Sequence, residues 1–153
     1  MPEPASNLLG TTLVVAQLTL ITVLGLAAAP LFLRGQAPLA AWVVGLAGGA
    51  LGVWALASNR PGNFNIRPVP RQGGQLIRSG PYRHIRHPMY SSVIACGVAC
   101  ALALGSAWSV LALLALIGVL VAKASIEERA MVRVHPDYAD YQARTRRFLP
   151  GIY

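Results

Sequence analysis

The sequence predicts an all-α, polytopic membrane protein with about four transmembrane helices, a cytoplasmic connector and a C-terminal helix. Three observations lead to this fold class. Only 12% of the 153 residues are charged, whereas a soluble domain carries about 25%. Asp, Glu, Lys and Arg are absent from three long runs, at 8–33, 35–59 and 89–122. All of the thirteen basic residues except Arg34 lie in two segments that separate or follow these runs.

The first two runs predict a helical hairpin over residues 8–57. Uncharged stretches of about 18 or more residues are typical of membrane spans. The hairpin is expected to break near Pro30–Pro38, where two prolines flank Arg34. Only Glu3 precedes the first run, so that run lacks the basic region of a cleaved signal peptide.

The third run predicts a second hairpin over residues 89–125. It is too long for one span of about 20 residues, and Gly105–Trp108 combines turn-forming residues with an interfacial aromatic. Each resulting helix is short. Two alternatives follow: an extension past Lys123, whose aliphatic stem can snorkel to the interface, or a tight hairpin.

Glycines recur in "GLAGGALG" at residues 45–52, inside the second run. A nucleotide-binding loop would need a strand before it, and none is predicted here. The pairs Gly45/Gly49 and Gly48/Gly52 instead fit the small-xxx-small pattern of packed membrane helices.

The distribution of arginine predicts the orientation. The connector, residues 58–88, contains six arginines and no acidic residue, and the tail, residues 126–153, is also rich in arginine. With four spans these segments share one side of the membrane, and the positive-inside rule makes that side, with both termini, cytoplasmic. A nucleic-acid-binding role would need a basic face on a soluble module, so we expect no nucleic-acid partner.

The connector and the tail carry further structural signals. Pro68 and Pro70 forbid a regular helix in the middle of the connector. A connector of this length is typical of a functional loop; the alternative is a surface loop whose arginines only contact lipid phosphates. In the tail, apolar spacing predicts a helix from Ile126, kinked near His135–Asp137 and ended by Pro150.

Polar residues concentrate on both sides of the second hairpin. The stretch "GPYRHIRHPMY" at residues 80–90 brings two arginines and two histidines to its start, and Glu127 and Glu128 stand at its end. Ionisable groups at membrane depth are functional candidates by default. The alternative is that both glutamates only pair with connector arginines and hold the tail in place. A metal site at the histidines is disfavoured because no Cys or carboxylate lies at ligand spacing.

This ordered set of motifs resembles the isoprenylcysteine carboxyl methyltransferase family and its relatives among membrane phospholipid methyltransferases, in particular short bacterial members. The shared pattern is Gly-x-Tyr, Arg-His-Pro-x-Tyr, a helical hairpin, a Glu-Glu pair, Tyr-x-x-Tyr and a closing Pro. The matching residues here are Gly80/Tyr82, Arg86 to Tyr90, Glu127/Glu128, Tyr138/Tyr141 and Pro150. "NFNIRPVP" at 63–70 is also similar to bacterial members, whereas "VHPDY" at 134–138 departs from the Phe-Gly that often precedes the tyrosine pair.

The resemblance implies that the whole chain, residues 1–153, is one membrane methyltransferase domain that binds S-adenosylmethionine in a cytoplasm-facing pocket. Arginines suit the donor's carboxylate, glutamates can accept hydrogen bonds from its ammonium or ribose, and tyrosines offer apolar faces to adenine. The implied donor-binding residues are Tyr82, Arg86, His87, Pro88, Tyr90, Glu127, Glu128, Tyr138 and Tyr141.

The implied reaction is carboxyl methylation of a lipophilic, isoprenylcysteine-like acceptor, a small molecule or a lipid-modified substrate. Arg144 or Arg147 would orient the carboxylate. One alternative is N-methylation of a phospholipid amine, with Glu127, Glu128 or His87 as the base; another is a non-enzymatic small membrane subunit. The expected location is the bacterial inner membrane, among membrane lipids.

Overall fold

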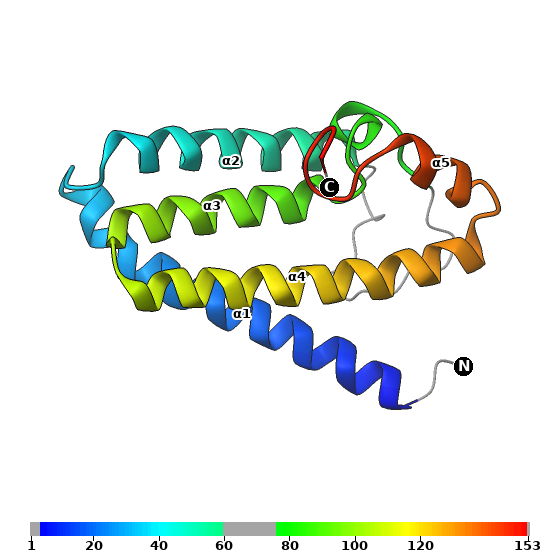
Figure 1. Cartoon of the computed structure of the whole chain (residues 1–153), viewed down its shortest axis with the longest axis horizontal. Helices are drawn as coiled ribbons and strands as arrows, with labels where there is room; N and C mark the ends of the chain where they lie inside the picture. The colour runs from blue at the N-terminus through cyan, green and yellow to red at the C-terminus, as the bar shows by residue number, and fades with distance from the viewer. Residues whose placement is uncertain (1–3, 60–75, 153) are drawn as a thin grey trace.

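The computed structural model describes residues 4–59 and 76–152, which form five α-helices and a short 3-10 helix (Figure 1). No β-strand occurs in this part of the chain, so the all-α prediction is confirmed. The connector's central motif, "NFNIRPVP", and Pro68 and Pro70 lie outside the described residues. The elements in chain order are α1 (Pro4–Leu33), α2 (Leu39–Ser58), η1 (Gly80–Arg83), α3 (Pro88–Leu104), α4 (Ala107–Val134) and α5 (Tyr138–Arg144).

Within the described residues, three helices are long and apolar enough to cross a membrane, namely α1, α2 and α4. Helix α3 is also apolar but has 17 residues, about 25 Å at 1.5 Å per residue. It contacts each of the three longer helices. The expected polytopic helical architecture is therefore present, with the shortest apolar helix in contact with all the others.

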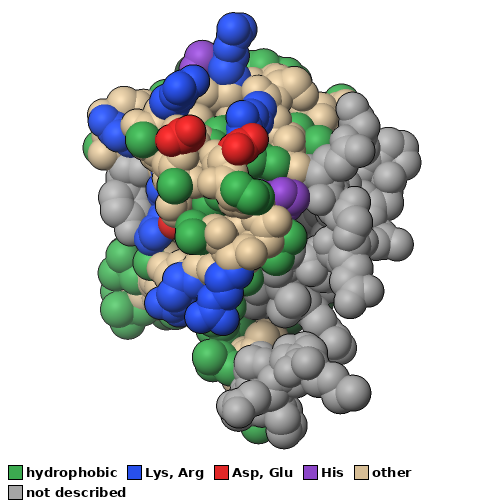
Figure 2. All heavy atoms as spheres, turned by 90° about the vertical axis from the view of Figure 1, so that its right-hand side faces the viewer, with side chains coloured by type: hydrophobic (Ala, Val, Ile, Leu, Met, Phe, Trp, Pro, Cys, Tyr) green, Lys and Arg blue, Asp and Glu red, His purple; other side chains and the backbone are tan. Residues whose placement is uncertain are grey.

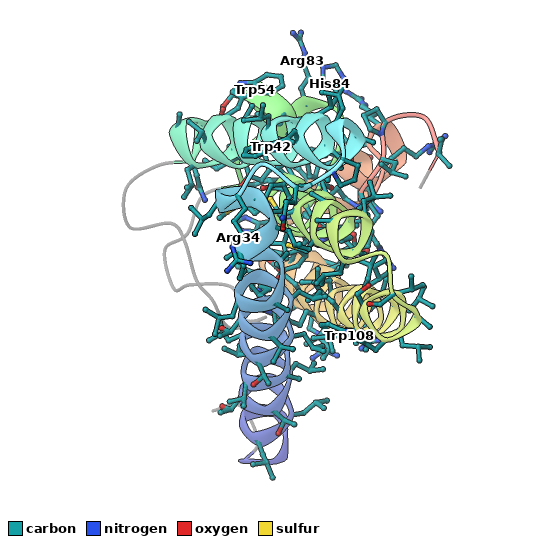
Figure 3. The ribbon with its side chains drawn as sticks, turned by 90° about the vertical axis from the view of Figure 1, so that its left-hand side faces the viewer. Arg34, Trp42, Trp54, Arg83, His84 and Trp108 are labelled. Carbon is teal, nitrogen blue, oxygen red and sulfur yellow. The ribbon has the colours of Figure 1, made fainter. Side chains whose placement is uncertain are left out.

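One end of the bundle holds the two tight turns (Figure 1). Arg34 lies in the α1–α2 turn, and Trp42 and Trp108 lie in the first turns of α2 and α4, which begin at this end (Figures 1 and 3). The break expected at Gly105–Trp108 is confirmed, because α3 ends at Leu104 and α4 begins at Ala107. Gly105 has φ +57° there, and its N–H donates to the Ala101 carbonyl oxygen at 3.0 Å, a left-handed cap that suits glycine.

Glycines let α2 pack closely against α3. A Cβ added at Gly48 would lie 2.9 Å from the Cβ of Ala95, and one added at Gly52 would lie 2.6 Å from the Ser92 hydroxyl. That hydroxyl donates to the Gly48 carbonyl oxygen at 2.7 Å. A Cβ added at Gly45 would lie 3.3 Å from the Cβ of Ala99, whereas one added at Gly49 would meet nothing within 4 Å among the described residues. The expected small-residue packing is therefore found at Gly45, Gly48 and Gly52 and not at Gly49.

The tail differs from its sequence prediction. Helix α4 continues through Ile126 to Val134 without a break, the turn at His135–Asp137 follows as expected, and α5 ends at Arg144 rather than at Pro150. The physical reason is a competing backbone partner. The Arg146 N–H donates to the His84 carbonyl oxygen at 3.0 Å, which draws the chain away from a helical path and back to the connector.

Candidate functional site

Charged side chains gather at the end of the bundle where α1 begins and where η1, α5 and the last turns of α4 lie (Figures 1 and 2). Basic, acidic and histidine side chains lie together on this face (Figure 2). The arginine asymmetry of the sequence thus corresponds to one polar end of the described structure, with Arg34 at the other end (Figure 3).

Short stretches of the connector and the tail lie side by side at this end. Ile85 and Arg146 form a parallel β-bridge. At the bridge the Arg86 N–H donates to the Arg146 carbonyl oxygen at 2.7 Å, and one residue further along the His87 N–H donates to the Arg147 carbonyl oxygen at 3.1 Å. Because His87 immediately precedes α3, this pairing holds the predicted Arg-His-Pro motif against the tail at the polar end of the bundle.

Glu128 of α4 is the centre of a buried ion-pair cluster. Its Oε1 accepts from Arg86 Nε at 2.8 Å and its Oε2 accepts from Arg147 Nη2 at 2.7 Å. Oε1 is also 3.1 Å from His87 Nε2, and Gln142 Nε2 approaches Oε2 at 3.4 Å. Protein donors therefore occupy both carboxylate oxygens. This is the arginine pairing that the sequence offered as the glutamates' alternative role.

Glu127, the adjacent residue, has a different environment. Its Oε2 accepts from the Tyr90 hydroxyl at 3.1 Å and lies 3.7 Å from His87 Nδ1, and its side chain is 32% exposed. The rings of His87 and Tyr90 are parallel, with centroids 5.2 Å apart. Among the described residues, the contacts of Glu127 involve Oε2, so Oε1 remains available to a ligand.

Three of the predicted tyrosines lie on η1 and α5: Tyr82 belongs to η1, and Tyr138 and Tyr141 belong to α5. Tyr138 and Tyr141 are buried, with ring centroids 5.7 Å apart, and the Tyr141 hydroxyl donates to the Tyr82 carbonyl oxygen at 2.7 Å. Burial, and next the negative charge of Glu127, raise the pKa of Tyr82 to about 12. Burial likewise raises the pKa of Tyr138 and of Tyr141. All three hydroxyls are therefore neutral donors near pH 7.

The predicted arginines divide into two groups. Arg86 also donates to the carbonyl oxygens of Gln142 and Thr145, and Arg147 also approaches the Ser125 hydroxyl at 3.3 Å. Arg144 is exposed at the end of α5 and has no hydrogen bond or ion pair within the described part of the chain. The structure thus brings Arg86 and Arg147 into the cluster and leaves Arg144 outside it.

Sequence reasoning missed the role of one cation. Lys123 does not snorkel to the interface: it is 1% exposed and donates to Oε1 of Gln17 on α1. Its Nζ lies 5.3 Å from the centre of the Tyr90 ring. The available signal was its position, as the sole lysine, one helical turn before Glu127.

An apolar cavity of about 350 Å³ lies next to the cluster. Phe148 belongs to its wall and also contacts the rings of His87 and Tyr90, at centroid distances of 5.9 and 6.5 Å. The Ser91 hydroxyl holds this part of the tail by donating to the Phe148 carbonyl oxygen at 2.7 Å. The other walls come from α2, η1, α3 and the last tail residues.

The fold and the polar site define a class of protein. It is a polytopic helical membrane protein in which a buried ion-pair cluster lies next to an apolar cavity at one end of the helical bundle. A family model described as phospholipid methyltransferase matches residues 40–137, which is more than half of the chain. The chain belongs to this family of membrane methyltransferases. The match supports the broader part of the sequence-based assignment and does not single out isoprenylcysteine methylation.

A curated relative has a similar segment. Over 87 residues the chain is 36% identical to the cobalt-zinc-cadmium resistance protein CzcN of Cupriavidus metallidurans, covering 54% of this chain and 38% of that protein. The chain thus spans well under half the length of this relative. Among the residues that the structure describes, no three His, Cys, Asp or Glu side chains are grouped as a metal site.

Proposed function

We propose that this protein transfers a methyl group from S-adenosylmethionine to the carboxylate of a lipophilic acceptor. The observation that carries the proposal is Glu127, which keeps one carboxylate oxygen available while Tyr90 and His87 hold the other side of the group. The family is a methyltransferase family whose members generally use this donor. The adjoining apolar cavity supports an acceptor with a hydrocarbon part.

The residues at the cluster suit the charges of the donor. Glu127 would attract its ammonium or accept from its ribose hydroxyls, while the neutral Tyr82 hydroxyl would donate. Arg86 and Glu128 are already bonded to each other and to the tail. We therefore assign Glu127, Tyr90 and His87 to contact with the donor, and Arg86 and Glu128 to holding them in place.

Methyl transfer to a carboxylate needs no base. The carboxylate oxygen attacks the sulfonium methyl carbon, the carbon–sulfur bond breaks, and its electron pair stays on the sulfur of the neutral leaving thioether. Alignment of the two reactants can contribute about 7–11 kcal/mol, and exclusion of water from the opposite charges adds to it. Of the two tail arginines expected to orient the carboxylate, Arg147 contacts the cluster and is the one we retain.

Donor binding tests the proposal directly. Wild-type protein in detergent should bind labelled S-adenosylmethionine, and Glu127→Gln should weaken that binding more than ten-fold, with about 1.4 kcal/mol for each factor of ten. Asp140→Asn on α5 is the matched control, because it removes the same charge from an exposed position. A wild-type protein that does not bind the donor would overturn the proposal. Equal binding by Glu127→Gln would remove Glu127 from the site.

The family description favours a second acceptor, a phospholipid amine. An ammonium must lose a proton before it attacks, and Glu127 is the carboxylate placed to take it. A carboxylate with an ordinary pKa near 4 should be methylated at a rate that stays flat from about pH 6 to 8. Methylation of phosphatidylethanolamine at a rate rising with pH, with no methyl ester formed on lipophilic carboxylates, would establish the amine instead.

The orientation belongs to the same proposal. We infer that the polar end faces the cytoplasm of a bacterial cell, where the soluble donor is made, and that the bundle lies in the inner membrane. The described arginines at that end support this through the positive-inside rule (Figure 2). The acceptor would then approach from the surrounding lipid.

A further inference from the structure

Lys123 is a buried cation in the middle of an apolar bundle. It is 1% exposed, and it is the chain's sole lysine among thirteen basic residues. The guanidinium groups of the ion-pair cluster are less buried, since the side chains of Arg86 and Arg147 are 12% and 21% exposed. Burial of an ammonium group at membrane depth is costly, so its contacts must offset a substantial desolvation penalty.

Two of those contacts link helices α1 and α4 to one aromatic ring. Lys123 Nζ donates to the side-chain oxygen of Gln17, itself buried on α1. Nζ also lies 5.3 Å from the centre of the Tyr90 ring, within the range of a cation–π interaction. Gln17 is neutral, so this hydrogen bond does not cancel the positive charge, and Nζ stays close to the Tyr90 ring on the helical face that Lys123 shares with Glu127, four residues later.

Tyr90 also contacts two residues of the candidate donor site. Its hydroxyl donates to Glu127 Oε2 at 3.1 Å, and its ring is parallel to that of His87 at 5.2 Å. A shift of the Tyr90 ring would therefore change the position of the carboxylate and of the imidazole together. The donor-binding groups named above depend on where this one ring lies.

We propose that Lys123, held by Gln17, is a positioning residue that fixes the Tyr90 ring and through it Glu127 and His87. This inference rests on the proposed function only in naming the cluster as the donor site. It also gives α1 a role: Gln17 lies outside residues 40–137, the part that matches the family. The family segment of this chain would thus require a side chain from a helix beyond it.

A simpler role for Lys123 is packing, because Tyr90 also contacts the core formed by Leu24, Leu116 and Leu120. The two roles predict different results for donor affinity. Lys123→Met keeps a long side chain without the charge, and Gln17→Leu removes the acceptor from the other helix. Leu116→Ala is the matched control, because it leaves a cavity in the same core and changes neither Lys123 nor Gln17.

We expect Lys123→Met and Gln17→Leu each to weaken S-adenosylmethionine binding by the folded fraction at least five-fold. The double variant should be no weaker than the worse single variant, since both changes break one chain of contacts. Leu116→Ala should lower the melting temperature and leave the dissociation constant unchanged. If Lys123→Met does not fold, Gln17→Leu decides. Donor affinity equal to that of the wild type in both folded variants would overturn the positioning role.

The sole lysine provides a readout that needs no donor. Selective isotope labelling of lysine gives a single side-chain NMR signal from this protein. Tyr90→Leu removes the ring, and Glu127→Gln removes the charge one turn away, so each should shift this signal. If the wild-type protein binds no donor, that result would contradict the proposed function and leave the positioning inference standing. A lysine signal unchanged by both substitutions would end the positioning inference, whatever the donor does.

Discussion

At the scale of single residues, the two adjacent glutamates divide the work of the site. Successive helical residues point about 100° apart, so Glu128 faces Arg86 of the connector and Arg147 of the tail, while Glu127 faces Tyr90. The first is bonded on both oxygens, and the second keeps one oxygen available. The sequence identified the pair as a candidate, but the separate environments come from segments that fold back from both sides of the hairpin.

The tyrosines illustrate the same point. Their spacing suggested faces for adenine, yet Tyr138 and Tyr141 are buried between α5 and η1. Tyr82, with a pKa raised to about 12 by burial and by the Glu127 charge, remains a hydroxyl donor across the neutral range. The assignment of Tyr138 and Tyr141 to donor binding stays a prediction, and their observed contacts are with the protein itself.

At the scale of elements, α5 and the tail are held by polar contacts to α4 and the connector. Helix α5 has seven residues, too few for stability on its own. Arg86 of the connector and Arg147 of the tail both bind Glu128, and the backbone bridge between Ile85 and Arg146 aligns the tail with the connector. The docking of this short helix therefore combines these backbone bonds with one buried carboxylate, to which both arginines bind.

Glu128→Gln should therefore loosen the tail selectively. Loss of this charge leaves two guanidinium groups without their anion, and breaking a buried pair costs about 3–5 kcal/mol. We expect faster amide hydrogen exchange in residues 138–152 and unchanged exchange in α2 and α3, measured by mass spectrometry. Glu127→Gln is the control and should leave exchange in the tail near the wild-type rate. Full protection of the tail in Glu128→Gln would show that the cluster does not hold it.

At the scale of the whole molecule, the bundle has two unlike ends. The start of α1, η1 and α5 lie at one end, and the tight turns with Arg34, Trp42 and Trp108 lie at the other (Figures 1 and 3). The charged cluster at the polar end adjoins an apolar cavity through Phe148, and under the proposed function S-adenosylmethionine and a membrane-borne acceptor would meet there.

This polarity predicts the topology in a cell. A reporter enzyme that is active only outside the cytoplasm should give no signal when fused to the C-terminus, because the positive-inside rule retains the arginine-rich end. The same reporter inserted at Gly35, in the turn that contains Arg34, should be active. Activity at the C-terminus would reverse the orientation and separate the site from a cytoplasmic donor.

The sequence by itself determined the all-α membrane architecture, the break at Gly105 and the concentration of polar residues on both sides of the second hairpin. These follow from local signals: uncharged length, turn formers, and the chemistry of ionisable groups near membrane depth. Only the tertiary structure decided that α5 ends at Arg144 and that Lys123 reaches Gln17. It also decided that both carboxylate oxygens of Glu128 accept hydrogen bonds from arginines, whereas Glu127 accepts one from Tyr90 through Oε2. These features depend on contacts between residues that are distant along the chain, and the spacing of residues along one helix carries no information about which partner lies opposite.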